Sequence, residues 1–222
     1  MNQEAMALWA SGLNPLLLQR NRRQPVARKW RVALVLAEEV ARWPAGRSVG
    51  IRCGRQRMGL CLMALAFTAE AGRIFPEWLR QAEEIVAQPL LVARNRQGYQ
   101  VYFFTGPAYS GGIWAGRYDR VNGRARVTPL IKAYGRGQWV TAVGSKPPGG
   151  MRYRFAAGKG YDDIPLLTIA EYERLMALSR AYDQRALGMR GASGMRGASV
   201  RGGRPRLAWL GRGGGGRWLS AR

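Results

Sequence analysis

The sequence contains no histidine, and this absence excludes several kinds of catalytic and metal site. Acid–base catalysis by an imidazole, Ser-His-Asp triads and zinc sites that mix Cys with His all require that residue. Cysteine is nearly absent as well, because Cys53 and Cys61 are the only two. Both lie in apolar, strand-like runs, so we expect buried free thiols and a reducing, cytoplasmic setting.

Long hydrophobic runs are also missing. No stretch of about 18 apolar residues without charge occurs, so we expect no transmembrane helix. The N-terminal stretch MNQEAMALWASG contains Glu4 and no basic leader, so we expect no secretory signal. Together these features predict a cytoplasmic protein without a membrane partner.

Acidic residues are scarce. The chain has 13 Asp and Glu against 36 Lys and Arg, which gives a formal charge of +23. Such an excess repels itself unless an anionic partner is bound. Nucleic acid is the partner that this balance favours, because phosphate neutralisation releases counterions, and arginine suits bidentate phosphate contacts. The alternative is a charge that serves general solubility.

The pattern of apolar residues predicts an α+β fold with a mixed or antiparallel sheet flanked by helices. Residues 47–54 and 59–67 have the character of two neighbouring strands, and residues 89–106 of a hairpin. Helices are expected at 4–12, 32–44 and 69–86, and another begins at Thr168 with Glu171 in the capping-box position. The Gly-rich basic segment 106–126 is expected to be a mobile loop that grips a strand.

The C-terminal residues differ from the rest. From residue 184 to residue 222 there are nine arginines and neither acids nor lysines, and GMRGAS occurs twice in tandem. Glycine at this density does not offset the entropy of ordering. We therefore expect a folded domain over 1–185 and a flexible Arg/Gly-rich tail over 186–222, in which Arg212 and Arg217 contact nucleic acid. The alternatives are a solubilising tail or a translation artefact.

Six segments, in order, resemble landmarks of the primase-polymerase domain of the archaeo-eukaryotic primase superfamily, in its plasmid, phage and mobile-element form. They are ALWASGLNPLLLQRNRRQPVARKW, EEVARWPAGRSVGIRCG, GLCLMALAF with FPEW, VARNRQGYQVYFF, KAYGRGQWVTAVGSKPPGGMRYRF and IPLLTIAEYERLMALSRAYD. The resemblance covers roughly residues 5–185. It implies an RRM-like sheet and nucleotidyl transfer with two magnesium ions.

The sequence departs from that family at each catalytic position. The resemblance implies paired acids at Ala64 and Ala66, a histidine at Gln100, and a third acid near Lys132. Methyl groups, an amide and an ammonium supply none of the hard oxygen ligands that magnesium requires. We therefore expect no catalytic residues, no metal and no cofactor.

The expected function is that of a pseudoenzyme: a DNA- or RNA-binding subunit of a replication, defence or mobile-element complex, bound to other protein subunits. One alternative is an active or deliberately inactivated primase-polymerase that uses Mg or Mn, and another is a structural component of a ribonucleoprotein. The candidate phosphate-binding residues in the expected basic cleft are Arg52, Arg55, Arg57, Arg94, Arg96, Lys132, Arg136, Ser145, Lys146, Arg152 and Arg154. Backbone contacts of this kind position a nucleic acid without reading its bases.

Overall fold

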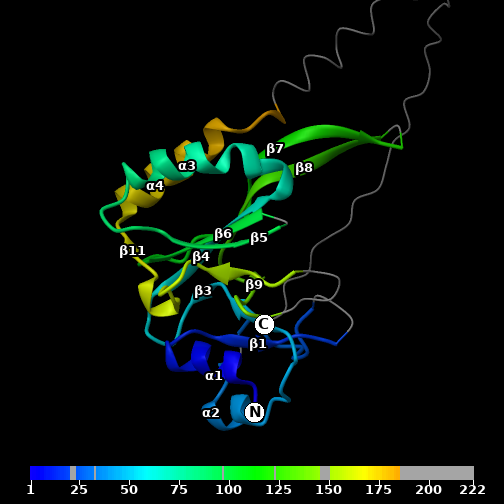
Figure 1. Cartoon of the computed structure of the whole chain (residues 1–222), viewed down its shortest axis with the longest axis vertical. Helices are drawn as coiled ribbons and strands as arrows, with labels where there is room; N and C mark the ends of the chain where they lie inside the picture. Colours follow the sequence, from blue (N-terminus) through cyan, green and yellow to red (C-terminus); the bar gives the residue numbers. More distant parts are fainter. Residues whose placement is uncertain (21–23, 33, 97, 123, 146–150, 186–222) are drawn as a thin grey trace, which may run out of the picture.

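A computed structural model describes residues 1–20, 24–32, 34–96, 98–122, 124–145 and 151–185. Within these ranges the protein is α+β, with two largely antiparallel sheets flanked by a few helices (Figure 1). The fold class expected from the sequence is confirmed at this level. Every helix in the described ranges is too short or too polar to cross a lipid bilayer.

The larger sheet has eight strands, six of which follow the spatial order β10-β5-β6-β4-β8-β7. Their bounds are β10 Arg154–Phe155, β5 Leu91–Asn95, β6 Gly98–Thr105, β4 Cys61–Thr68, β8 Arg124–Tyr134 and β7 Gly112–Val121. Two further short strands extend it: β3 (Gly54–Arg55) pairs with β4, and β11 (Leu166–Leu167) pairs with β6. β4 thus lies inside the sheet, with a long strand on each side.

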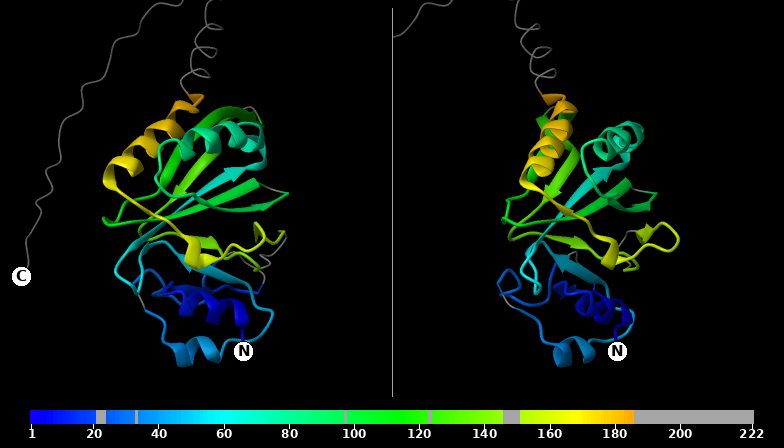
Figure 2. Two further views of the ribbon diagram at one scale, coloured as in Figure 1. Left: turned by 60° about the vertical axis from the view of Figure 1, so that its left-hand side comes forward. Right: turned by 90° about the vertical axis from the view of Figure 1, so that its left-hand side faces the viewer.

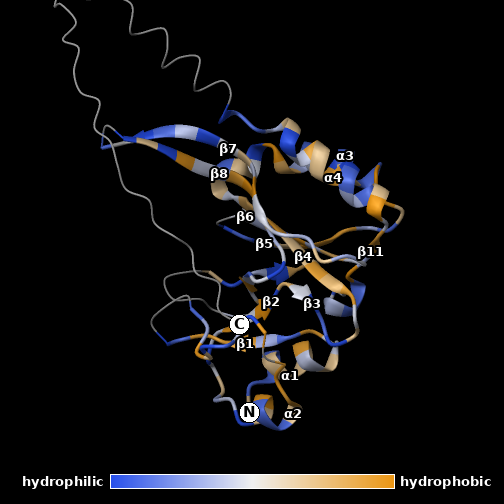
Figure 3. Cartoon of the chain, turned by 180° about the vertical axis from the view of Figure 1, so that it is seen from behind, coloured by the Kyte–Doolittle hydropathy of each residue, from blue (hydrophilic) through white to orange (hydrophobic). Residues whose placement is uncertain are grey.

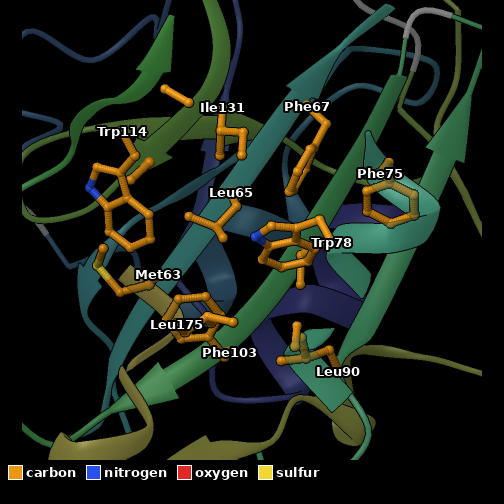
Figure 4. Packing of buried hydrophobic residues seen from close by; sticks show 14 of the residues in the cluster. Met63, Leu65, Phe67, Phe75, Trp78, Leu90, Phe103, Trp114, Ile131 and Leu175 are labelled. Carbon is orange, nitrogen blue, oxygen red and sulfur yellow. The ribbon is translucent and has the colours of Figure 1, made fainter. Parts of the chain in front are cut away.

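Two helices, α3 (Phe75–Glu83) and α4 (Ile169–Ala181), cover one face of this sheet (Figures 1 and 2). A 3-10 turn, η1 (Ala69–Arg73), leads from β4 into α3. Met63, Leu65 and Phe67 of β4 point into the core beneath the two helices, where they meet residues such as Trp78 (Figure 4). The Trp78 indole N–H donates to the buried Ser179 hydroxyl at 3.1 Å, and this bond ties α3 to α4.

The opposite face of the large sheet packs against a smaller three-stranded sheet with the order β1-β2-β9. Its strands are β1 (Pro15–Leu17), β2 (Val49–Arg52) and β9 (Trp139–Thr141), and α1 (Gln3–Ala10) and α2 (Ala37–Ala41) lie beside it (Figure 2). A second 3-10 turn, η2 (Tyr161–Asp163), precedes β11. Leu62 and Ala64 of β4 belong to this second core, because side chains alternate along a strand.

Several local predictions are confirmed. β5 and β6 form the expected hairpin about residues 95–98. α4 begins at a capping box in which Thr168 and Glu171 exchange hydrogen bonds. Pro76 stands in the first turn of α3, and Gly12 follows α1 with φ +75°. Proline is compatible with that position because the first helical N–H groups have no intrahelical acceptor.

Two strand predictions are wrong in their pairing. Segment 47–54 was expected beside segment 59–67, but β2 pairs with β1 and β9 in the smaller sheet. Only the two residues of β3 reach β4. Only Cys53 lies between β2 and β3, and Gly54, the first residue of β3, has φ +89°, a left-handed conformation that redirects the chain between the sheets. Residues 137–145, whose composition also predicts a strand, contain β9 (Trp139–Thr141), so this strand is confirmed.

The helix expected over 32–44 is limited to the five residues of α2. Leu34 and Leu36, which contribute to the helical spacing, are 62% and 66% exposed, so they do not form a buried helical face. Segment 106–126 was expected to be a loop, but most of it lies in β7 and the start of β8. These strands form an antiparallel hairpin with Asn122 at φ 51°, as an Asn-Gly hairpin turn requires.

Candidate nucleic-acid interface

The four positions that resemble a degenerate catalytic site lie on three adjacent strands. Ala66 of β4 is directly opposite Gln100 of β6 on one side and Lys132 of β8 on the other. Residues directly opposite one another in a sheet share a face, and so do residues two apart in a strand. Ala64, Ala66, Gln100 and Lys132 therefore all point toward the face that carries the smaller sheet. We call these four residues the alanine row.

The chemistry of the alanine row does not fit a magnesium ion. Ala64 is buried and Ala66 is partly exposed, and both offer only methyl groups. The Gln100 side-chain oxygen accepts a hydrogen bond from the buried Tyr102 hydroxyl at 2.5 Å. The Lys132 ammonium lies 4.5 Å from the centre of the Tyr134 ring, so a cation already occupies this face. Burial raises the pKa of Tyr102 well above its ordinary value, which keeps its hydroxyl a neutral donor.

Neighbouring acids are engaged elsewhere. Glu70 lies four residues beyond Ala66, and its carboxylate forms an ion pair of 2.5 Å with Arg117. Asp163 accepts from the Gly160 backbone N–H and pairs with Lys159, so it stabilises a turn. In the described ranges, no group of three or more acids and cysteines converges as a metal site requires.

Arginines gather around a pocket at the other end of β4. The pocket has a volume of about 770 Å³, and five arginines line it together with Val32, Leu34, Cys53, Gln56, Gly59, Ala108 and Gly137. The arginines are Arg31, Arg52, Arg55, Arg57 and Arg136, and no carboxylate is among the lining residues. We call this pocket the arginine groove. It unites four of the residues that the sequence singled out with a fifth, Arg31.

A close approach of two chain segments forms the groove. Gly54 lies so near to the segment after β8 that a Cβ there would be 3.0 Å from the Arg136 Cα. The buried Gln56 side chain donates to the carbonyls of Arg52 at 2.8 Å and Gly54 at 2.7 Å, and accepts from the Asn14 N–H at 2.9 Å. Gln56 thus fixes the β3 turn. This role could not be predicted from the sequence, since a glutamine in a basic turn carries no distinctive pattern.

Two of the groove arginines are held by contacts within the protein. Arg52 is only 7% exposed, and its guanidinium reaches the carbonyls of Arg31 and Arg55 at 3.3 and 3.4 Å. Burial lowers its pKa, because a low-dielectric surrounding disfavours the charged form. Arg57 stacks 3.6 Å above the Trp9 ring and donates to the Trp9 carbonyl at 2.8 Å. Contacts of this kind pre-organise guanidinium groups before a ligand arrives.

A second group of arginines lies at the β10 edge of the large sheet. Arg154 of β10 is directly opposite Arg94 of β5, and the Asn95 amide donates to the Met151 carbonyl at 3.1 Å, which holds the two segments together. Arg94 is also opposite Tyr99, whose ring stacks on Phe75 of α3. Arg94 and Arg154 therefore face the helices.

The candidate residues do not share a single cleft. Arg94 and Arg154 point to the face opposite Gln100 and Lys132. Arg96 and Arg152 are exposed near this edge. Ser145 is 1% exposed, and its hydroxyl accepts from the Val49 N–H at 2.5 Å, so it joins β2 to the segment after β9. Three further candidates lie outside the described residues: Lys146, Arg212 and Arg217.

Comparison with known proteins adds no further constraint on this interface. The chain matches no protein-family model, and no curated protein is significantly similar to it.

Proposed function

We propose that this protein is a catalytically inactive, primase-polymerase-like nucleic-acid-binding subunit that holds a phosphate backbone in the arginine groove. One observation carries the proposal: five arginines surround one pocket whose lining contains no carboxylate. Like charges at this density repel one another, and a polyanion removes that repulsion.

The groove favours a backbone over a single small anion. Arg31, Arg55 and Arg136 are exposed around it, while Arg52 lies deep inside. Guanidinium groups bind phosphate oxygens in a bidentate manner, and several of them along a groove follow successive phosphates. Such contacts fix position and orientation without reading base identity, so the expected binding is independent of sequence.

The alanine row supports the relation to primase-polymerases. Its four positions come from three segments that are far apart in the sequence, around residues 64–66, 100 and 132, and the resemblance alone assigns them to one catalytic site. Their convergence on three adjacent strands is the arrangement that the resemblance requires. With methyl groups in place of carboxylates, the site retains no ligand set for two-metal transfer, so binding is the activity that remains. We expect a role within a replication, defence or mobile-element complex.

A salt titration of the full chain tests the proposal. Binding of a fluorescent DNA oligonucleotide is measured by anisotropy between 50 and 200 mM salt for the wild type and for R31Q/R55Q/R136Q. The matched control is R73Q/R174Q/R180Q, which removes the same charge from exposed arginines of η1 and α4. Each phosphate contact contributes ~0.7 to the slope of log affinity against log salt on single strands and ~0.9 on duplexes. The loss of three contacts therefore lowers the magnitude of this slope by about 2–3.

The control separates the groove from bulk charge. We expect the groove variant to lose affinity and salt slope, and the control to retain most of both. Equal behaviour of the two variants would assign binding to net charge alone and would contradict the proposal.

A further inference from the structure

The β7–β8 hairpin extends beyond the rest of the fold as a two-stranded arm (Figure 1). Its base is fixed at Gly116, whose N–H donates to the Asp183 carboxylate at 3.1 Å and whose carbonyl accepts from the Gln184 N–H at 2.9 Å. On the other strand, the Pro129 carbonyl accepts from the Thr68 hydroxyl at 3.1 Å. Beyond the Gly116–Pro129 pair, the register continues through five further residue pairs to Val121 and Arg124. Arg117, in the first of these pairs, still forms an ion pair with Glu70 of η1, so the free part of the arm begins at Tyr118 and Val127 and is roughly 14 Å long at ~3.4 Å per residue.

The free part of the arm is basic. It carries Arg120, Arg124 and Arg126 against the single acid Asp119, and Arg117 lies at its base. Arg117 is neutralised by Glu70 and Asp119. Arg120, Arg124 and Arg126 are exposed, and no carboxylate of the described residues lies within ion-pair distance of them. Hydrophilic residues accordingly dominate the far end of the hairpin in Figure 3.

The two faces of the arm have different side chains. Tyr118 and Arg120 lie on one face, opposite Val127 and Ala125 of the other strand. Tyr118 is 40% exposed although it is a large aromatic residue, and no contact in the core accounts for its position. The other face carries Arg124 and Arg126 beside the Arg117–Asp119 pair. The arm thus presents cations on both faces, and an aromatic with small apolar residues on one of them.

We propose that this arm inserts into the major groove of B-form DNA. This inference rests on the proposed function and specifies the ligand as duplex DNA. Paired strands lie ~4.8 Å apart, and a B-DNA major groove about 12 Å wide admits a two-stranded ribbon with its side chains. Arg124 and Arg126, on the other face of the ribbon, meet the phosphates that border the groove, while Arg120 shares the face of Tyr118. Tyr118 and its apolar neighbours face the base edges, where thymine methyl groups offer apolar contact.

The geometry distinguishes DNA from RNA. The major groove of A-form RNA is deep and too narrow for side chains to read, so it does not admit a ribbon. A single strand has no groove at all. The arm therefore adds affinity for duplex DNA and none for duplex RNA or single strands.

The test uses the full chain and three probes of equal length and sequence: duplex DNA, duplex RNA and single-stranded DNA. The arm variant R120Q/R124Q/R126Q is compared with R120K/R124K/R126K, which retains the charge, and with R73Q/R174Q/R180Q. For the arm variant we expect the salt slope on duplex DNA to fall by roughly 1.8, at ~0.9 for each of the two phosphate contacts of Arg124 and Arg126, and to stay unchanged on the other two probes. The lysine variant retains the slope, and methyl green, a major-groove ligand, competes with the wild type where netropsin does not.

The outcomes separate this inference from the proposed function. Unchanged binding of single strands by the arm variant also shows that it is folded. An equal loss on all three probes, or no loss on duplex DNA, would overturn the insertion of the arm even where R31Q/R55Q/R136Q still weakens binding. If R31Q/R55Q/R136Q bound all three probes as tightly as the wild type, the proposed function would be overturned. The effect of the arm variant on duplex DNA could still be interpreted in that case.

Discussion

An aspartate is expected to have very different effects on stability at the two alanines of the alanine row. Ala64 has no exposed surface and lies in the core between the two sheets, opposite Tyr102 and Tyr134. Ala66 is partly exposed and lies opposite Lys132. The substitutions Ala64→Asp and Ala66→Asp therefore place the same carboxylate in two different environments, only two residues apart.

The expected magnitudes follow from these environments. Ala64→Asp buries a charge without a cationic partner directly opposite, and an uncompensated buried charge costs ~3–5 kcal/mol. Ala66→Asp gains a cross-strand partner in Lys132, and such pairs contribute ~0.2–1 kcal/mol. We expect the first variant to lose ~3–5 kcal/mol of unfolding free energy and the second to remain within about 1 kcal/mol of the wild type.

Urea denaturation followed by tryptophan fluorescence measures both values at pH 7. The Ala66→Asp gain should disappear in Lys132→Met, which completes a double-mutant cycle. Equal stability of the two aspartate variants would refute the assignment of faces along β4. We expect no primer synthesis with magnesium or manganese by the double aspartate variant, because Gln100 and Lys132 still supply no carboxylate; detectable synthesis would refute this expectation.

Three further perturbations probe the groove and the fold. Trp9→Leu removes the ring beneath Arg57 without a change in charge. Because the cation–π contact contributes ~0.5–1 kcal/mol, we expect a two- to five-fold loss of nucleic-acid affinity, measured by anisotropy, with an unchanged salt slope. Gly98→Ala places a Cβ in contact with a β4 carbonyl oxygen, so thermal unfolding should reveal a loss of at least roughly 1–3 kcal/mol, and a neutral result would contradict the β4–β6 register. Hydrogen bonds from Thr168 and from the Ala87 N–H lower the pKa of Glu171, so its contribution is present above pH 4.5 and lost as the pH falls below it. Glu171→Gln keeps an amide that can complete the capping box but loses the negative charge near the helix N-terminus, so it should cost about 0.3–1 kcal/mol at pH 7 and remove that dependence in acid denaturation; a pH profile identical to that of the wild type would contradict this.

The parts of the fold that the sequence predicted depend on local signals. The capping box at Thr168, the hairpin at residues 95–98 and the turn into α3 each require only a few consecutive residues. The pairing of β2 could not be predicted in this way. Segments 47–54 and 59–67 have the same apolar character, and only the tertiary position of β1 and β9 decides which strand pairs with β2.

The sequence of the β7–β8 arm contains a hairpin signal, but the amino-acid composition around it is that of a loop. Asn122-Gly123 is the strongest short hairpin signal, but the surrounding glycines and arginines are typical of a flexible loop. The strands form because Val121 to Gly116 and Arg124 to Pro129 keep a regular register despite the charge. The same charge protects this edge of the sheet from pairing with another chain, because arginines along an exposed strand disfavour edge-to-edge association.

Some residues of the candidate site could likewise be predicted from local sequence and others could not. Arg52, Arg55 and Arg57 are close in sequence, so their proximity in the groove could be predicted, whereas the contribution of Arg136 depends on the close approach at Gly54. The alanine row could be identified only through the family resemblance, because two alanines in a strand do not by themselves indicate a functional site. The alanine row and the arginine groove are connected through β4. This strand carries the two alanines and pairs both with β3, at the groove, and with β8. Because positions 64 and 66 carry methyl groups rather than carboxylates, they add no negative charge to the sheet that positions the arginines, and the positive potential of the groove is higher than it would be with acids there.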